Sequence, residues 1–299
     1  MPSEPIRDLS SDVDKTVPRL IPLRADHLPQ AVGLSSALGW PYREADWRFA
    51  FNLGAGFAAE FDGRLVATAL WWAYGASHAS VGMVIVDPEM QGRGLGRTLM
   101  GELLHAAHDR TVLLNSTQEG LPLYTQLGFV VRGQVYQHQA MLIQKPHLAR
   151  SRVGVRAMAA NDEEQVRLLD QAAMGMDRTA LLDALFEAGT IMVHDQGTGV
   201  SAYACAREFG HGVVIGPVIA KGSRDASDAM ALIAALAGLY HGRFVRIDVT
   251  EASGLSGWLS ELGLACVGHA VAMVRGIQTP ARSTEATARL FALSNQSFG

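Results

Sequence analysis

The pattern of apolar and polar positions predicts alternating strands and helices in the first half of the chain. A strand at residues 20–24 precedes a helix from Asp26 to Leu38 and a second helix that begins near Glu44. We further expect strands at residues 56–61, 65–72, 80–86 and 112–115, helices at 94–108 and 120–127, and strands from 129 to 143. Asp62-Gly63 is a strong signal for a tight hairpin turn. The order β-α-α-β-β-β-α-β-α-β-β predicts an α/β (α+β) fold.

Three glycines separate the strand at 80–86 from the helix that follows it. The stretch reads Gln91-Gly92-Arg93-Gly94-Leu95-Gly96-Arg97-Thr98, after a strand that ends in Val86-Asp87-Pro88. Glycines let the backbone turn tightly and aim several N–H groups at one point. The helix N-terminus adds free donors and the positive end of its dipole, and Arg93 and Arg97 add charge. The stretch therefore predicts an anion site, most naturally for phosphate.

The spacing of these glycines narrows the choice of ligand. A dinucleotide fingerprint needs G-x-G-x-x-G and a Walker A loop needs G-K-[ST], and neither is present. The order Q-x-x-G-x-G after this strand resembles the acetyl-CoA pyrophosphate loop of the GNAT acyltransferase superfamily, although a glycine-rich structural turn would look the same. The resemblance implies that acetyl-CoA is the cofactor, bound by residues 91–98. It also implies that backbone N–H groups around Val84, Ile85 and Val86 polarise the thioester carbonyl.

The chain repeats its own pattern after a basic linker at residues 145–152. Residues 112–115 parallel 245–248, residues 126–129 parallel 261–264, and residues 81–86 parallel 213–218. With 299 residues, two domains are expected. We divide the chain into a polar leader (1–17), an N-terminal GNAT domain (18–146), a C-terminal GNAT-like domain (152–276) and a tail with a helical apolar stripe (277–299). Each domain is expected to hold a mixed, mostly antiparallel twisted sheet flanked by helices.

The second copy lacks the phosphate-binding sequence. The repeat places residues 224–229 opposite the glycine loop, and that window contains no glycine but two carboxylates, Asp225 and Asp228. A diphosphate would meet like charge there. Trp258 or Leu259 falls where the first copy has Tyr124. We therefore expect acyl-CoA to bind only the first domain, and the second to be structural, to shape the acceptor site or to bind a regulator.

The chemistry of acyl transfer directs attention to a few side chains. A phenol can hydrogen-bond and protonate a departing thiolate, and Tyr124 matches the tyrosine that does this in GNAT domains; a core aromatic is the alternative interpretation. Asn115 could orient Tyr124, the cofactor or a water, or merely cap a strand end. No general base stands out. Acceptor contacts are expected from Trp40, Tyr42, Trp72 and His78, although core packing explains the aromatic residues equally well.

The charge and the apolar segments of the chain limit the classes of partner that we expect. The formal net charge is −4 without blocks of like charge, which argues against nucleic acid and anionic membranes as partners. The longest apolar helix, residues 229–239, is too short to span a bilayer, and residues 1–19 lack a signal peptide. We expect a cytoplasmic monomer or homodimer without a metal. Cys205 and Cys266 are expected to be buried free thiols.

The resemblance implies an N-acetyltransferase that moves an acetyl group from acetyl-CoA to a primary amine by direct attack. A small-molecule acceptor is the leading interpretation. The alternatives are an acetyltransferase that acts on a protein amine, and a non-catalytic acyl-CoA sensor.

Overall fold

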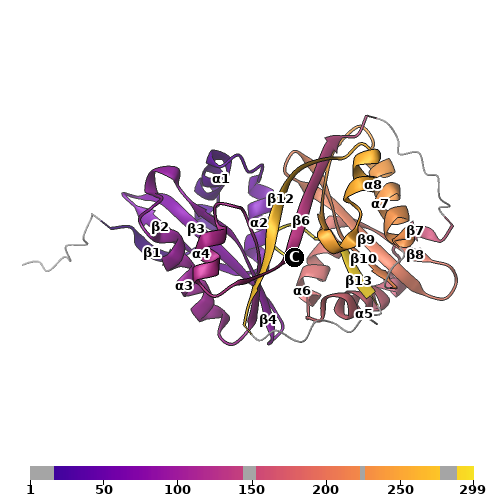
Figure 1. The fold of residues 1–299 in the computed structure, drawn as a ribbon, viewed down its shortest axis with the longest axis horizontal. Helices are drawn as coiled ribbons and strands as arrows, with labels where there is room; N and C mark the ends of the chain where they lie inside the picture. The colour runs from indigo at the N-terminus through magenta and orange to yellow at the C-terminus, as the bar shows by residue number, and fades with distance from the viewer. Residues whose placement is uncertain (1–16, 144–152, 223–225, 277–287) are drawn as a thin grey trace, which may run out of the picture.

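The first half of the chain is a twisted, mostly antiparallel sheet with helices on both faces (Figure 1). The computed structural model describes residues 17–143, 153–222, 226–276 and 288–299. The elements of this half are β1 (Arg19–Pro22), η1 (Ala25–His27), α1 (Leu28–Ala37), α2 (Glu44–Leu53), β2 (Ala55–Phe61), β3 (Arg64–Tyr74), β4 (His78–Val86), η2 (Pro88–Met90), α3 (Leu95–Ala107), β5 (Thr111–Ser116), α4 (Leu121–Gln126) and β6 (Val130–Met141). Asp62 and Gly63 both have positive φ, 49° and 71°, as the predicted hairpin turn requires.

The second half repeats these α-helices and strands in the same order. They are β7 (Val155–Ala157), η3 (Ala160–Asp162), α5 (Glu163–Met174), α6 (Thr179–Ala188), β8 (Gly189–Asp195), β9 (Val200–Phe209), β10 (Gly212–Lys221), α7 (Ser227–Leu239), β11 (Phe244–Thr250), η4 (Glu251–Ser253), α8 (Ser256–Glu261) and β12 (Ala265–Arg275). A further strand, β13 (Ala288–Ala292), follows. The predicted mixed α/β architecture and its internal repeat are therefore confirmed.

The two halves share one sheet because they exchange strands. The thirteen strands run in the order β1-β2-β3-β4-β5-β12-β6-β11-β13-β10-β9-β8-β7. β12, from the second half, pairs with β5 of the first, and β6, from the first half, pairs with β11 of the second. β6 and β12 also pair with each other, antiparallel, at the centre of the molecule (Figure 1). The domains predicted from the sequence are thus interlocked rather than strung along the chain.

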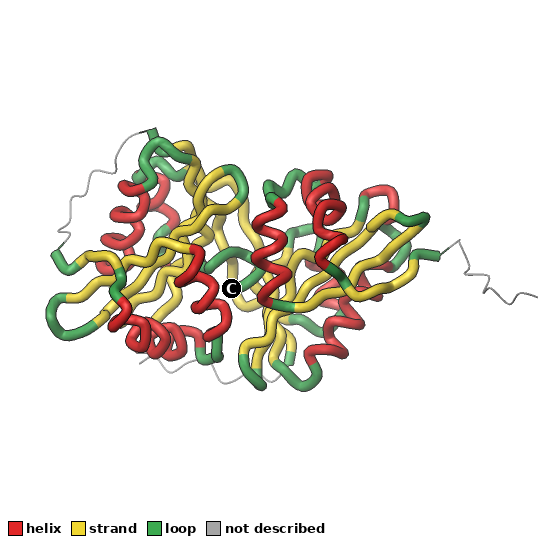
Figure 2. Tube along the Cα trace, turned by 180° about the vertical axis from the view of Figure 1, so that it is seen from behind, coloured by secondary structure: helices red, strands yellow, loops and turns green. Residues whose placement is uncertain are grey.

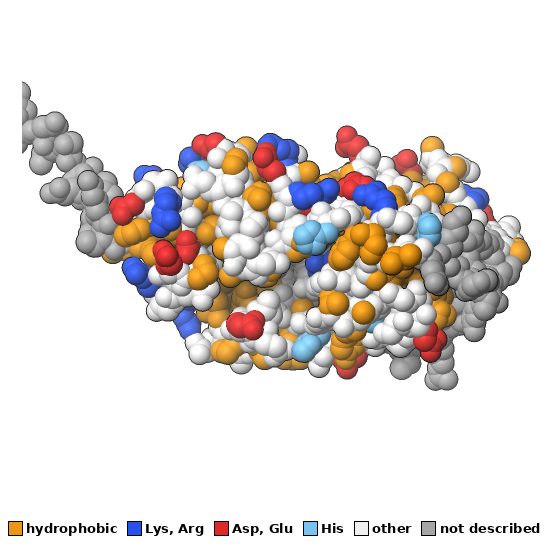
Figure 3. All heavy atoms as spheres, turned by 90° about the horizontal axis from the view of Figure 1, so that it is seen from above, with side chains coloured by type: hydrophobic (Ala, Val, Ile, Leu, Met, Phe, Trp, Pro, Cys, Tyr) orange, Lys and Arg blue, Asp and Glu red, His pale blue; other side chains and the backbone are white. Residues whose placement is uncertain are grey.

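Helices cover both faces of this sheet (Figure 2). Apolar side chains of α3 and α4 pack on the first half's strands as one cluster, and those of α7 and α8 pack on the second half's strands as another. A third cluster is common to both halves, since it joins α1 and α2 to α5 and α6. Among the described residues, no helix has the length and apolarity to cross a membrane. Acidic and basic side chains are interspersed on the face shown in Figure 3.

Three predictions about individual segments are wrong. In place of several strands from 129 to 143 there is one long strand, β6 (Val130–Met141), because the neighbour expected from the same half is replaced by β12. The tail is not helical where it is described: Ala288–Ala292 form β13, since β10 and β11 offer unpaired backbone groups to an apolar run that suits either geometry. Cys205 is buried, as expected, but Cys266 is exposed at the start of β12.

The last described residues, 293–299 (the closing segment), run back from the second half onto the first. Tyr74 donates its hydroxyl proton to the carbonyl of Phe298 at 2.6 Å, and the Phe298 ring packs edge-on against Trp72 at 4.8 Å between centroids. Arg178 lies beneath, fully buried, with Nη2 2.5 Å from Asp170 Oδ2 and Nη1 3.0 Å from the carbonyl oxygen of Gly299. These contacts join both halves and the closing segment in one core.

We predict that Arg178→Met destabilises the fold by about 3–5 kcal/mol, because it leaves the buried Asp170 carboxylate without its cation. The measurement is the free energy of unfolding in urea. Arg48→Met is the matched control, since Arg48 pairs with Glu44 at the surface with both side chains about half exposed; it should change the free energy by less than about 1 kcal/mol. Equal effects of the two substitutions would contradict this role for Arg178.

Candidate active site

Strands β4 and β5 diverge and leave an opening in the first half's sheet. They pair in parallel over His78–Ser80 and Thr111–Leu113, and beyond that point β5 continues beside β12. The β4 residues 81–86 then have β3 on one side and no strand on the other. We call this opening the wedge. It supplies unpaired backbone groups to anything that enters it.

A bulge at Met83 shapes the wedge. The β3–β4 register shifts here, and Met83 has a φ of +52°, which is uncommon for a residue with a side chain. Thr68 stabilises the bulge by donating its hydroxyl proton to the Met83 carbonyl at 3.0 Å. Strained backbone conformations of this kind cluster at active sites and ligand-binding sites.

Beyond the bulge, backbone groups of β4 face the wedge. The Asp87 N–H donates to the carbonyl of Val66 on β3. Hydrogen-bonded and non-hydrogen-bonded residues alternate along an antiparallel pair, so the N–H and C=O of the preceding residue, Val86, point away from β3. Consistent with this, the Val86 carbonyl accepts a hydrogen bond from the Gln91 side chain at 3.2 Å. Val84 lies in the bulge. Ile85 is buried in the core, 1% exposed, and serves packing.

The glycine loop lies directly beyond β4. Gly92 and Gly94 have φ of +75° and +81°, and a Cβ at either position would meet no atom within 4 Å, so the space around the loop is open. α3 begins at the next residue, Leu95, which is buried and anchors the turn. A Cβ on Gly96 would lie 3.4 Å from Leu123 of α4, an ordinary van der Waals contact, so α3 and α4 pack against each other here.

The side chains around the loop are exposed and polar. Arg93, Arg97 and Thr98 all face solvent at the N-terminal end of α3. Thr98 bonds the carbonyl of Gly94 at 3.2 Å, and Arg97 contacts the side-chain oxygen of Gln126 on α4. Open backbone, a helix N-terminus and two guanidinium groups form a surface that suits a diphosphate.

Tyr124 lies on α4 beside the wedge with an unengaged hydroxyl. Its ring packs edge-on against Phe129 at 6.0 Å and covers Gly120, where a Cβ would be 2.9 Å from the ring. Burial raises the pKa of the Tyr124 hydroxyl to about 12, so it keeps its proton at neutral pH. Among the described residues this hydroxyl has no hydrogen-bond partner. A protonated, unpartnered phenol is equipped to donate to an anion that forms nearby.

Asn115 contacts the closing segment rather than Tyr124. Its side-chain N–H donates to the carbonyl of Gln296 at 2.8 Å, which fastens the closing segment to the end of β5. The contact gives no support to an orienting role toward Tyr124. A catalytic role for Asn115 stays a prediction.

A cavity of about 250 Å³ lies between the halves, where the wedge meets the closing segment. We call it the central cavity. It is lined by residues 39–42, Gly82, Met83, Asn115, Thr117, Gln137, Arg246, residues 268–270, Gln296 and Ser297. Ser297 packs closely on β4. A Cβ added to Gly82 would lie 2.9 Å from the Cβ of Ser297, which explains the glycine at position 82.

Two of the four expected acceptor residues line the central cavity and two do not. Trp40 and Tyr42 form its aromatic wall; burial raises the pKa of Tyr42, whose hydroxyl lies 3.3 Å from Ser297 Oγ. Trp72 is a core residue, bonded to the carbonyl of Ala50 at 2.8 Å. His78 lies at the paired end of β4, away from Met83, with burial lowering its pKa and Ser77 2.8 Å from its Nδ1. The central cavity thus gives no support to acceptor roles for Trp72 and His78, and those roles stay predictions.

The residues that sequence reasoning missed come from the other half of the chain. Arg246 on β11, His269 on β12 and Gln296 in the closing segment all line the central cavity. His269 has its Nε2 3.0 Å from the side-chain nitrogen of Gln118. No local signal marks these residues, because only the exchange of β6 and β12 brings them to the first half's site.

The corresponding opening in the second half is filled. β10 and β11 pair over Val213–Ile215 and Val245–Ile247 and then diverge, as their counterparts do. β13 occupies the space between them, pairing antiparallel with residues 218–221 of β10 and through Ala292 with Val249 of β11.

The start of α7 is closed as well. Asp228, in its first turn, accepts a hydrogen bond from Ser201 at 2.8 Å and lies 3.2 Å from Nδ1 of His194. Asp225 lies outside the described residues. The alignment gives Trp258 or Leu259 in place of Tyr124, and Leu259 is a fully buried core residue. The second half has the frame of the site without its open groove.

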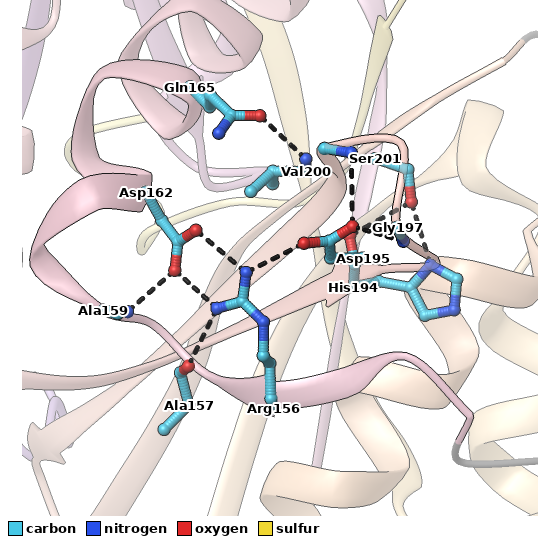
Figure 4. Close-up of polar contacts among 11 residues, drawn as sticks. Arg156, Ala157, Ala159, Asp162, Gln165, His194, Asp195, Gly197, Val200 and Ser201 are labelled. Carbon is cyan, nitrogen blue, oxygen red and sulfur yellow. Dashed lines mark hydrogen bonds and ion pairs between the residues drawn. The ribbon is translucent and has the colours of Figure 1, made fainter.

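The densest polar cluster of the second half is structural (Figure 4). Arg156 donates to Asp162 Oδ1 at 2.9 Å and to Asp195 at 3.0 Å, and Asp195 also accepts the backbone N–H groups of Gly197 and Gly199. The guanidinium lowers the pKa of both carboxyls. Because these groups bond one another, the cluster fixes the β8–β9 turn to β7 rather than facing a ligand.

The open wedge, the glycine loop at the start of α3 and Tyr124 are arranged as the resemblance to the GNAT acyltransferases implies. Comparison with known proteins agrees: residues 24–129 match the acetyltransferase (GNAT) family, and residues 166–288 match an acetyltransferase (GNAT) domain. The chain therefore belongs to the GNAT acetyltransferases and carries two GNAT domains.

Relatives share this organisation over most of their length. The chain is 29% identical over 253 residues to the uncharacterized N-acetyltransferase YitH of Bacillus subtilis, covering 83% of this chain and 88% of that one. A putative acetyltransferase from Pyrococcus horikoshii has the same fold, with a TM-score of 0.77 over 99% of both chains at 17% identity. A tandem GNAT protein from the clavulanic acid biosynthesis pathway has a TM-score of 0.63 over 88% of this chain and all of its own, at 15% identity.

We predict that Tyr124→Phe lowers kcat by roughly 10²- to 10⁴-fold, because it removes the proton donor and keeps the ring that packs on Phe129. Affinity for CoA, measured by calorimetry, should stay within about twofold. Tyr240→Phe is the matched control: it removes a hydroxyl that bonds Thr190 at 2.9 Å on the far side of the second half, and kcat should not change. An unchanged kcat in Tyr124→Phe, with chemistry limiting, would make Tyr124 a packing residue.

Proposed function

We propose that the first half transfers an acetyl group from acetyl-CoA to a primary amine of a small molecule, with direct attack of the amine on the thioester. The observation that carries this proposal is the asymmetry of the two wedges. In the first half the wedge is open, begins at a glycine loop and ends at the central cavity. In the second half the chain's own β13 fills it.

The glycine loop and β4 supply the groups that bind acetyl-CoA. Backbone N–H groups at Gly92–Gly96, with Arg93 and Arg97, hold the pyrophosphate at the start of α3. Unpaired backbone groups of β4, at Val84 and Val86, bind the pantetheine arm and polarise the thioester carbonyl. This places the acetyl group at the mouth of the central cavity, beside the Met83 bulge.

The acceptor must arrive as a neutral amine. An alkyl amine with a pKa of about 10.4 costs about 4–5 kcal/mol to deprotonate at pH 7, so a dry cavity or a proton outlet has to offset that. The amine nitrogen then forms its bond to the carbonyl carbon, and the bond from that carbon to sulfur breaks. The amine's surplus proton leaves to water. The hydroxyl of Tyr124 hydrogen-bonds and protonates the departing thiolate, and the phenolate then recovers a proton from water.

Two features favour a small molecule over a protein amine or a sensing role. The acceptor space is a cavity of about 250 Å³ between the halves, walled by the closing segment, rather than a groove along the surface. A sensor would have no use for an unpartnered tyrosine hydroxyl beside the wedge. Free thiol release from acetyl-CoA with a pooled amine library tests this directly: binding without turnover favours a sensor, and turnover with peptides alone favours a protein acceptor.

We expect one acetyl-CoA site per chain, and Gly94→Asp should abolish it. The substitution puts a carboxylate into open space at the helix N-terminus, where it blocks the backbone donors and repels the diphosphate. Calorimetric titration gives the stoichiometry and the affinity.

Gly63→Asp is the matched control, because Gly63 also has positive φ and open space, but lies in the β2–β3 turn. Both variants strain a left-handed residue, so only the position differs. Two equivalent sites per wild-type chain, or equal affinities of the two variants, would contradict the proposal.

A further inference from the structure

Arg246 reaches the first half's site from the second half. It lies on β11, its side chain is 11% exposed, and it lines the central cavity. Among the described lining residues it is the one with a permanent charge, and none of them is a carboxylate. The one permanently charged group among these lining residues is therefore a cation.

The guanidinium is fixed by Asp248, which is completely buried. Nε of Arg246 lies 3.0 Å from Asp248 Oδ2, and Nη2 lies 3.0 Å from Oδ1. Asp248 Oδ1 also accepts from the side chain of Gln296 at 3.1 Å, and its burial keeps this carboxylate from an incoming amine. Phe209 supports the guanidinium from below, 5.5 Å from Cζ to the ring centroid.

The remaining nitrogen of the fork, Nη1, has no hydrogen-bond partner among the described residues. Asp248 takes Nε and Nη2 and leaves this end of the guanidinium available to the cavity. An arginine desolvated to this extent gains most from a carboxylate, which accepts its N–H groups and complements its charge. A ligand without an acceptor here would displace water from the Nη1 donors without replacing its hydrogen bonds.

We propose that Arg246 binds a carboxylate of the acceptor, so that the acceptor is an amino acid with a free carboxylate and an apolar side chain. The inference rests on the proposed function and names its substrate class. The aromatic wall of Trp40 and Tyr42 suits the apolar side chain, and about 250 Å³ suits a molecule of this size. A phosphorylated amine has the same charge sign, but one arginine without a helix N-terminus or lysine beside it favours the singly charged group.

The same contact explains why the second half keeps its frame after losing its groove. Arg246 and its anchor Asp248 lie on β11, and β11 is held beside the first half by its pairing with β6. The second half thereby contributes the specificity-determining cation of a reaction that it does not run.

The test compares three amines that share a phenyl ring: phenylalanine, phenylalanine amide and phenethylamine. With acetyl-CoA saturating, the full chain should use phenylalanine with a kcat/KM roughly 10- to 100-fold above the other two, as expected for one charged hydrogen-bonded contact. In Arg246→Gln this preference should vanish, mainly through a higher KM for phenylalanine. Affinity for CoA should not change, because the glycine loop is remote from β11.

Two further variants separate binding from folding. Arg246→Gln with Asp248→Asn removes both charges together and leaves no unpaired buried carboxylate, so its loss of preference reports the contact itself. Arg243→Gln is the matched control. Arg243 directly precedes β11, but its side chain is 42% exposed and pairs with Glu208 at the surface. It should keep the wild-type preference.

Several outcomes would overturn the inference and leave the proposed function standing. Equal use of the three amines, or a preference that survives in the double variant, would exclude the carboxylate contact. Transfer to phosphoethanolamine that Arg246→Gln abolishes, without transfer to phenylalanine, would assign the cation to a phosphate. Transfer to no amine at all, with acetyl-CoA bound, would instead reject the proposed function.

Discussion

The pairing of β6 with β12 is the interaction on which the rest of the structure depends. Each of these strands leaves its own half and pairs with the strand that precedes its counterpart in the other half. Two repeats that would otherwise be joined by a linker become one sheet with a shared core beneath α1, α2, α5 and α6. A fragment ending near residue 150 would lack β12, the strand that pairs with β5 in the full chain.

The exchange also decides where the acceptor space lies. It brings β11 against β6, and with it Arg246 and Asp248, to the edge of the first half's wedge. The closing segment then crosses from β13 to the same place, held by Asn115 at Gln296 and by Tyr74 at Phe298. The central cavity is therefore built from both halves, although the glycine loop and Tyr124 belong to the first alone.

The same arrangement of strands has an open groove in the first half and a filled one in the second. In both, a parallel pair of strands separates after three residues of pairing. In the first half the edge of β4 stays open beside a loop of glycines; in the second the edge of β10 is satisfied by β13, and Asp228 bonds Ser201 at the helix start. Unpaired backbone inside a protein is costly, so a groove that has lost its ligand gains stability when the chain fills it.

The sequence by itself determined the order of the elements, the internal repeat, the Asp62-Gly63 turn and the glycine loop before α3, because periodicity and glycine conformation are local properties. It also singled out Trp40 and Tyr42, which line the central cavity, and Tyr124, whose role stays a prediction. It could not determine the strand exchange, since β6 and β12 have the same local pattern whichever half they pair with. The placement of Arg246 and Gln296 at the cavity and the strand conformation of Ala288–Ala292 depend on that long-range pairing. The burial of Trp72 in the core likewise depends on what packs above it. Only the tertiary structure, in which distant backbone groups find their partners, decided these points.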